Sequence, residues 1–278
     1  MIYLKTYCYS PHEIDFINLN LKEAYDHIDK FIICEYNRTH TGHERENGMF
    51  RDNFHRIDQD KIDKIQYFAA DISNLTVFAD TDANTIHQVN EPVMRGLFVK
   101  LMEFQPDDII ISIDADEIIY GNMIPKIVDM VRTQHSCVLL NLHQFFYGIN
   151  YFWEGKEFKA PIAARFDYYR HFPAQWRYDG VNFPEIAGCH FSWVMGIERM
   201  MYKSQVYSHP EYRKWATKEA FERAIHKKDF FHPDDRKMNL KTLPFSPDVD
   251  LYPRKIFENK EVWEKYVYGL DEKDQGGK

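Results

Sequence analysis

The chain has 278 residues, of which 44% are hydrophobic and 16% aromatic, which is enough to build a substantial buried core. Its formal net charge of −8 argues against a general nucleic-acid-binding protein, which normally carries a basic face, but it is compatible with a local positive site for a small anion. No stretch reaches the roughly 18 to 20 consecutive apolar residues of a membrane-spanning helix. We therefore expect neither a nucleic-acid partner nor a membrane span.

The cysteines and the opening segment bear on the compartment. Cys8, Cys34, Cys137 and Cys189 are widely separated and form neither a Cys-x-x-Cys pair nor a dense framework, which favours reduced thiols. The opening MIYLKTYCYSPHEID lacks the basic region, apolar segment and small-residue cleavage site of a secretory signal peptide. These features predict a cytoplasmic protein.

The first part of the chain alternates between apolar strands and amphipathic helices. Strands are expected at residues 2–8, 31–35, 64–71 and 108–117, and helices at 11–29, 51–61 and 91–104. Ser10 is a suitable cap for the first helix, and Pro92 suits the first turn of the last one. This alternation predicts an α/β fold with a mainly parallel sheet and helices on both faces.

The pattern changes after residue 135. Short apolar and aromatic runs separated by turns continue to about residue 200, which indicates a mixed or antiparallel extension of the same sheet. Residues 197–228 are helical and charged, and the polar segment that follows contains one expected helix around 256–268. We expect one domain at residues 1–230, with a polar C-terminal tail at 231–278 packed on it.

The stretch IIISIDADEII places three carboxylates at the end of a buried strand. Ligands of open α/β sheets bind beyond the carboxyl ends of the strands, where Asp114 and Asp116 are expected. In extended backbone these two side chains point to the same side, and Ala115 between them is small. Two hard oxygen ligands suit Mg²⁺ or Mn²⁺, and Glu117 is a supporting carboxylate. The alternative is an acidic turn exposed to water.

Other chemistries that use paired aspartates fit less well. A calcium EF-hand loop starting at Asp114 needs glycine at its sixth position and glutamate at its twelfth, where this chain has Ile119 and Pro125. A phosphatase with an aspartyl nucleophile has threonine or valine where Ile118 stands, on the first strand of its fold. A metal-dependent phosphohydrolase or nuclease is nevertheless an alternative, because it would use the same acids on water.

Several segments together resemble glycosyltransferase family 17, which contains the β-1,4-mannosyl-glycoprotein 4-β-N-acetylglucosaminyltransferases. They are ICEYNRTHTG (33–42), EPVMRGL (91–97), DIIISIDADEI (108–118) and GCHFSWVMG (188–196). The resemblance implies a GT-A-like nucleotide-sugar fold at residues 1–230, a UDP-sugar donor, a glycan acceptor and an inverting mechanism. The family pattern often has tryptophan where this chain has Cys189, and no membrane anchor is seen, so a microbial or viral relative of the Golgi enzymes is expected.

The resemblance also implies roles for residues around the donor. Asp116 is the expected direct ligand of Mn²⁺ or Mg²⁺, Asp114 a ligand of the metal or the ribose, and His190 a third metal or phosphate ligand, unless it is a hydrogen-bonded core residue. Residues at the ends of the earlier strands are expected to contact the nucleotide: Glu35, Asn37, Arg38, Thr39, Asp71 and Arg95. For Glu35 and Asp71 the alternative is a capping or loop carboxylate, and for Arg95 it is an ion pair with a carboxylate. Lys203 and His209 are expected to close over the phosphates.

Inverting transfer also needs a carboxylate base near the anomeric carbon. Glu185, shortly before His190, is the first candidate, with Asp179 and Glu154 as alternatives. The sequence thus predicts a metal-dependent transfer of N-acetylglucosamine or a related hexose. A sugar-nucleotide binder without catalysis is the remaining alternative.

Overall fold

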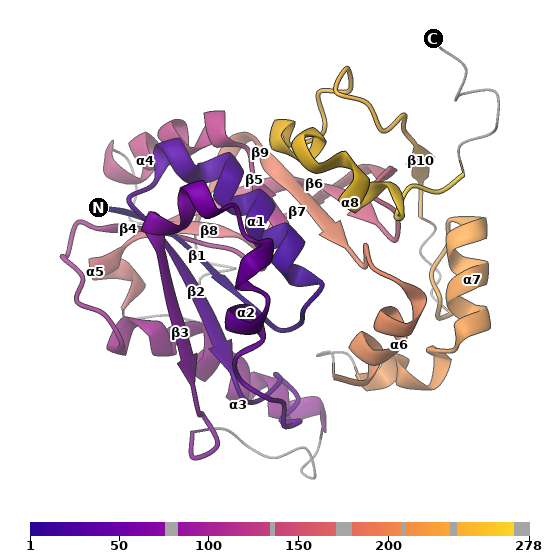
Figure 1. Ribbon diagram of the computed structural model, residues 1–278, viewed down its shortest axis with the longest axis horizontal. Coiled ribbons are helices and arrows are strands. Elements are labelled where there is room, and N and C mark those ends of the chain that lie inside the picture. Colours follow the sequence, from indigo (N-terminus) through magenta and orange to yellow (C-terminus); the bar gives the residue numbers. More distant parts are fainter. Residues whose placement is uncertain (76–82, 134–136, 171–179, 207–209, 234–237, 270–278) are drawn as a thin grey trace.

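The computed structural model describes residues 1–75, 83–133, 137–170, 180–206, 210–233 and 238–269. The strands are β1 (Ile2–Tyr7), β2 (Lys30–Tyr36), β3 (Ile65–Ala70), β4 (Ile109–Ser112), β5 (Glu117–Ile119), β6 (Cys137–Phe146), β7 (Tyr151–Phe158), β8 (Ile162–Arg165), β9 (Val181–Ser192) and β10 (Leu240–Thr242). The α-helices are α1 (Glu13–Ala24), α2 (Met49–Asp52), α3 (Ala83–Gly96), α4 (Ile124–Thr133), α5 (Phe166–Tyr169), α6 (Ile197–Val206), α7 (Lys218–Lys227) and α8 (Lys260–Glu264). They form one α/β body around a single sheet (Figure 1).

The sheet is mixed rather than mainly parallel. The strands β3, β2, β1 and β4 lie side by side and parallel, as the alternation of strand and helix predicts. Beyond β4 the order continues through β8, β6, β7 and β10, all paired antiparallel, while β9 pairs parallel with β6 and antiparallel with β5. In this half β6 and β7 follow each other through a short turn, and a short turn can join only antiparallel strands.

Helices cover both faces of the parallel part, as expected. On one face α1 and α4 bury Ile14, Ile17 and Ile127 against alternate residues of β1 and β4. On the other face α3, the short 3₁₀ helix η4 (Leu97–Lys100) and α5 cover the remaining strand residues. Because β1, β2 and β4 are buried on both sides, their sequences are mainly apolar and can be recognised as strands, whereas the edge strand β3 is only partly buried.

Three local expectations are wrong. Pro92 lies inside α3, which begins at Ala83 rather than near Glu91, so this proline does not mark the first turn. Ser10 is not the N-cap of α1; its hydroxyl instead pairs with His12 Nδ1 at 2.5 Å. The helix expected at 51–61 is replaced by α2 and two 3₁₀ helices, η2 (Phe54–Arg56) and η3 (Gln59–Lys64).

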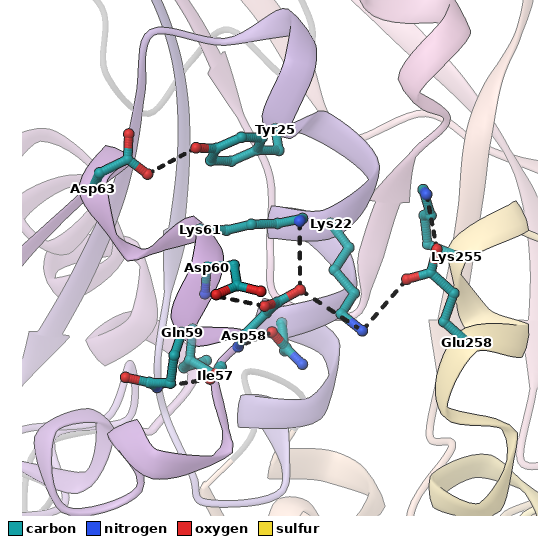
Figure 2. Close-up of polar contacts among 11 residues, drawn as sticks. Lys22, Tyr25, Ile57, Asp58, Gln59, Asp60, Lys61, Asp63, Lys255 and Glu258 are labelled. Carbon is teal, nitrogen blue, oxygen red and sulfur yellow. Dashed lines mark hydrogen bonds and ion pairs between the residues drawn. The ribbon is translucent and has the colours of Figure 1, made fainter.

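The C-terminal segment packs against the first helix. The Trp263 ring of α8 lies 4.8 Å from the Phe16 ring of α1, and Figure 1 shows the two helices next to each other. A polar seam runs beside this contact: Lys22 Nζ lies 3.5 Å from Glu258 and 4.0 Å from Asp58 (Figure 2). The segment also adds β10 to the edge of the sheet. It therefore helps to hold α1, whose N-terminus borders the site described next.

Candidate active site

The sheet order places a switch point between β1 and β4. The chain leaves β1 toward β2 and β3 on one side, and β4 returns on the other side. Loops that diverge from neighbouring parallel strands leave a natural ligand site at the carboxyl ends of those strands. Here the β1–α1 turn meets the Asp114–Glu117 turn, and Asn20 Nδ2 of α1 donates to the Ala115 carbonyl at 3.0 Å. The predicted acidic site therefore lies where the topology favours a ligand.

The three acids occupy a tight turn rather than an extended strand end. The Glu117 N–H donates to the Asp114 carbonyl at 3.0 Å, and the buried Glu117 side chain accepts from the Asp114 N–H at 2.6 Å. Strand alternation therefore does not apply to these acids, although the negative charge of Asp114 still acts on Asp116. Glu117 supports the site by closing this turn.

Asp114 is held by Arg95, one of the two alternatives for that arginine. The two terminal nitrogens of Arg95 donate to the two oxygens of Asp114 at 3.1 and 3.3 Å, while its Nε donates to Glu91 at 2.6 Å. Arg95 is buried, and the negative charges of Asp114 and Glu91 raise its pKa despite burial, so it stays cationic. The charge of Asp114 is therefore offset by Arg95, and a metal ion bound by Asp114 would share the carboxylate with this arginine.

Asp116 faces a histidine and a lysine. Its Oδ1 lies 3.7 Å from His190 Nε2, and its Oδ2 lies 3.6 Å from Lys203 Nζ of α6. The Phe191 N–H donates to the Asp116 carbonyl at 2.8 Å, which ties the acidic turn to β9. Burial alone would raise the pKa of Asp116, but Lys203 and His190 outweigh it and lower the pKa to about 2. Asp116 is thus ionised at any physiological pH.

His190 is oriented by its neighbours. Gln144 Nε2 donates to the Phe145 carbonyl at 3.0 Å, so its Oε1 faces His190 Nδ1 at 3.0 Å and can only accept a proton there. Nδ1 therefore carries a hydrogen, and Nε2 is the nitrogen that faces Asp116. The imidazole also packs on the Phe158 ring, with 4.0 Å between centroids.

The Asp116–His190 pair fits a divalent cation that is also bound by a diphosphate. A histidine fixed through its other nitrogen is the usual arrangement of a metal ligand, and Mn²⁺ or Mg²⁺ at phosphate sites often has only one or two protein ligands. Among the described residues, no group of three or more His, Cys, Asp or Glu side chains is placed to hold a metal. The substrate would therefore have to complete the coordination.

The residues predicted at the ends of β2 and β3 divide into two groups. Glu35 is fully buried and accepts from the N–H groups of Gly48, Met49 and Phe50 and from the Tyr67 hydroxyl, at 2.6 to 3.0 Å. These four bonds use the full acceptor capacity of a carboxylate, so Glu35 has the capping role and not the nucleoside role.

Asn37 and Asp71, in contrast, lie together at the surface. Asn37 Nδ2 donates to Asp71 at 2.8 Å, and the Ser73 N–H lowers the pKa of Asp71. Arg38 turns inward, where it donates to the Gly42 carbonyl and pairs with Glu44 at 3.1 Å, and the Thr39 hydroxyl accepts from the His43 N–H. Arg38 and Thr39 thus shape their own loop.

The structure does not bring the predicted bases to Asp116. Glu185 pairs with Lys126 of α4 at 2.7 Å on an exposed surface, and it precedes His190 by five strand positions, which is about 16 Å. Glu154 is exposed and pairs with Lys241 of β10. Asp179 and His209 lie outside the described residues.

Comparison with protein families decides between the alternatives left open above. The family model described as glycosyltransferase family 17 matches residues 7–228. The chain belongs to glycosyltransferase family 17. Its acidic turn, Arg95, His190 and Lys203 all lie within the matched residues, so the protein is a glycosyltransferase with a donor and an acceptor as substrates. A phosphohydrolase, nuclease or non-catalytic binder is not supported.

Comparisons with curated proteins and with solved structures add little to the family assignment. No curated protein matches the chain. A Mycobacterium sp. strain JC1 homologue of a Mycobacterium tuberculosis protein is 8% identical with a TM-score of 0.38, over 68% of this chain and 88% of that one. The 4-diphosphocytidyl-2C-methyl-D-erythritol synthase of Anaerococcus prevotii is 11% identical with a TM-score of 0.35, over 59% and 70%. TM-scores this low carry no conclusion about function.

Within the described part of this family 17 chain, no helix is long and apolar enough to cross a membrane.

Three further residues of this family 17 chain border the site and were not predicted. Glu13 and His12 stand at the start of α1, and Arg199 lies one helical turn before Lys203 on α6. Burial, then Arg199 and Lys203, lower the pKa of His12 to about 3, so it is neutral at pH 7. The spacing Ser10-x-x-Glu13 is a capping-box signature that could have indicated Glu13, but no sequence signal points to Arg199.

Proposed function

We propose that the protein transfers a sugar, N-acetylglucosamine or a related hexose, from a UDP-sugar to a glycan acceptor with inversion at the anomeric carbon. The observation that carries the proposal is the convergence of His190 Nε2 and Lys203 Nζ on the ionised Asp116, at 3.7 and 3.6 Å. The acidic turn follows the strand at the switch point of the sheet, which supports a GT-A-like arrangement of the donor.

Asp116 and His190 would hold Mn²⁺ or Mg²⁺ together with the donor diphosphate. The bound ion supplies Lewis-acid stabilisation of the departing diphosphate. Gln144 keeps the His190 lone pair directed at the site, and the bond from the Phe191 N–H fixes the backbone of Asp116. Arg95 neutralises Asp114 so that Asp116 is the acid left to bind.

The cations of α6 complete the leaving-group site. Lys203 is anchored by Asp116 and by the Trp193 ring, with 5.3 Å between Nζ and the ring centroid. Arg199 lies on the same face of the helix, one turn earlier. Together they offset the negative charge that develops on UDP, while Asn37 and Asp71 at the neighbouring strand ends are the proposed contacts of the nucleoside.

A thermal-shift screen tests the donor class without knowledge of the acceptor. Unfolding temperatures are measured with UDP, UDP-N-acetylglucosamine, UDP-glucose, GDP and CDP, each with and without Mn²⁺. The proposal expects stabilisation by UDP compounds that is larger with Mn²⁺. Asp116→Asn should abolish the Mn²⁺-dependent part, while Asp250→Asn, at an exposed aspartate of the C-terminal segment, should retain it. Equal shifts with all three nucleotides, or an unchanged response of Asp116→Asn, would contradict the proposal.

A further inference from the structure

Glu13 is a carboxylate fixed through one oxygen at the carboxyl end of β1. As the first residue of α1, it closes the turn that leads from β1 into the helix. Its Oε2 accepts from the Tyr9 N–H at 2.5 Å and from the Ser10 N–H at 3.1 Å. Two backbone donors hold that oxygen in place without a charged partner. The backbone of the turn therefore fixes the orientation of the Glu13 carboxylate.

The second oxygen of Glu13 is available to a ligand. Among the described residues no donor bonds to Oε1, and the side chain is only partly buried. The charged and titratable groups that act on it come from three other elements: Asp116 of the acidic turn, Lys203 and Arg199 of α6, and Arg45 of the loop after β2, with Cys8 beside it on its own turn. Glu13 thus shares its surroundings with the proposed diphosphate site.

These surroundings favour a carboxylate that can take up a proton. Burial raises the pKa of Glu13 to about 7, and the bond from the Tyr9 N–H, which lowers the pKa, only partly offsets it. General bases work best when their pKa lies near the working pH. Glu185 and Glu154, by contrast, are exposed and are each paired with a surface lysine.

We propose that Glu13 is the general base of the transfer reaction, with Oε1 accepting the proton of the acceptor hydroxyl. The inference rests on the function proposed above. In the step, the hydroxyl proton passes to Oε1 and the hydroxyl oxygen forms a bond to the anomeric carbon. The bond from that carbon to the diphosphate oxygen breaks on the opposite face, and its electron pair leaves with UDP. Glu13 then returns the proton to water.

The test compares three glutamate-to-glutamine variants. Glutamine at position 13 keeps an oxygen that can accept the Tyr9 and Ser10 N–H bonds, so the turn and the helix start are preserved. Glu13→Gln should lower kcat for transfer about 100-fold or more, with the Kd of the UDP-sugar unchanged. Glu185→Gln and Glu154→Gln should keep kcat within about twofold, because both residues lie in surface ion pairs.

The pH dependence separates a base from a helix cap. A base must be ionised to act, so kcat/KM of the wild-type protein should rise with pH through the pKa of Glu13, and this rise should be missing in Glu13→Gln. Should Glu13→Gln fail to fold, the wild-type profile alone decides, and a flat profile from pH 5 to 8 would overturn the proposal. Full turnover by Glu13→Gln would overturn it while leaving the proposed function standing. Absence of UDP-sugar turnover in the wild-type protein would overturn both.

Discussion

Replacing Asp116 by asparagine is expected to lower the free energy of unfolding by about 2 kcal/mol at pH 5. This value follows from the pKa of Asp116, which falls from 3.8 to about 2 because Lys203 and His190 outweigh the opposing effect of burial. Each pKa unit corresponds to about 1.4 kcal/mol of preference for the charged form, so the shift amounts to about 2 kcal/mol. The side chain is only 16% exposed, so solvent screens the interaction little.

The sign of the pH dependence gives the sharper test. A carboxylate whose pKa is lowered in the folded state contributes its full stability above its unfolded pKa, near 4, and loses it as the pH falls toward 2. Urea unfolding of both proteins at pH 5, 4 and 3, with a chelator present, should give a difference that is largest at pH 5 and shrinks toward pH 3. Equal stability at pH 5, or a difference that grows as the pH falls from 5 to 3, would refute the electrostatic account of Asp116.

Three further predictions concern the packing and the donor site. Trp263→Ala should lower the free energy of unfolding, measured in urea, by about 3 to 5 kcal/mol because it leaves a cavity where a ring was buried. Trp215→Ala, at an exposed ring, should lower it by less than about 1 kcal/mol. Similar losses in the two variants would contradict the packing described for the C-terminal segment. Glu35→Gln should lower the free energy of unfolding by about 2 kcal/mol because it leaves buried donors unpaired. The affinity for UDP, measured by calorimetry, should not change. Weaker UDP binding without a loss of stability would instead support the nucleoside role of Glu35. Lys203→Met should weaken UDP binding about tenfold or more. Lys214→Met, which changes a lysine beside the exposed Trp215, should leave UDP binding unchanged. Equal dissociation constants for the two variants would show that Lys203 does not bind the diphosphate.

The parallel half of the fold could be predicted because its physics is local. Strands β1, β2 and β4 are short, mainly apolar runs covered on both faces, and each of the connections from β1 to β2 and from β3 to β4 contains a helix with an apolar face. Pro92 misled the placement of α3 because proline suits a first turn, yet a helix tolerates it in its interior when neighbouring contacts hold the chain. The antiparallel pairing of β6 with β8 depends on turn geometry that apolar patterning does not specify.

The candidate site was predicted in its location but not in its bonding. Asp116 and His190 meet because β5 and β9 pair, and Gln144 reaches His190 only through the parallel register of β6 and β9. Such non-local registers leave no mark in a single sequence. The nearness of Glu185 to His190 in the sequence favours it as the base, but five positions of extended strand place it about 16 Å away, in the ion pair with Lys126.

Release of UDP and formation of a glycosylated product, measured from UDP-N-acetylglucosamine and related UDP-sugars with a panel of glycan acceptors, tests the central claim most directly. The account predicts turnover that requires Mn²⁺ or Mg²⁺, inverts the anomeric configuration, and falls at least 100-fold in Asp116→Ala, with Asp250→Ala as the matched exposed control. Turnover that continues undiminished in Asp116→Ala, or that retains the anomeric configuration, would contradict it.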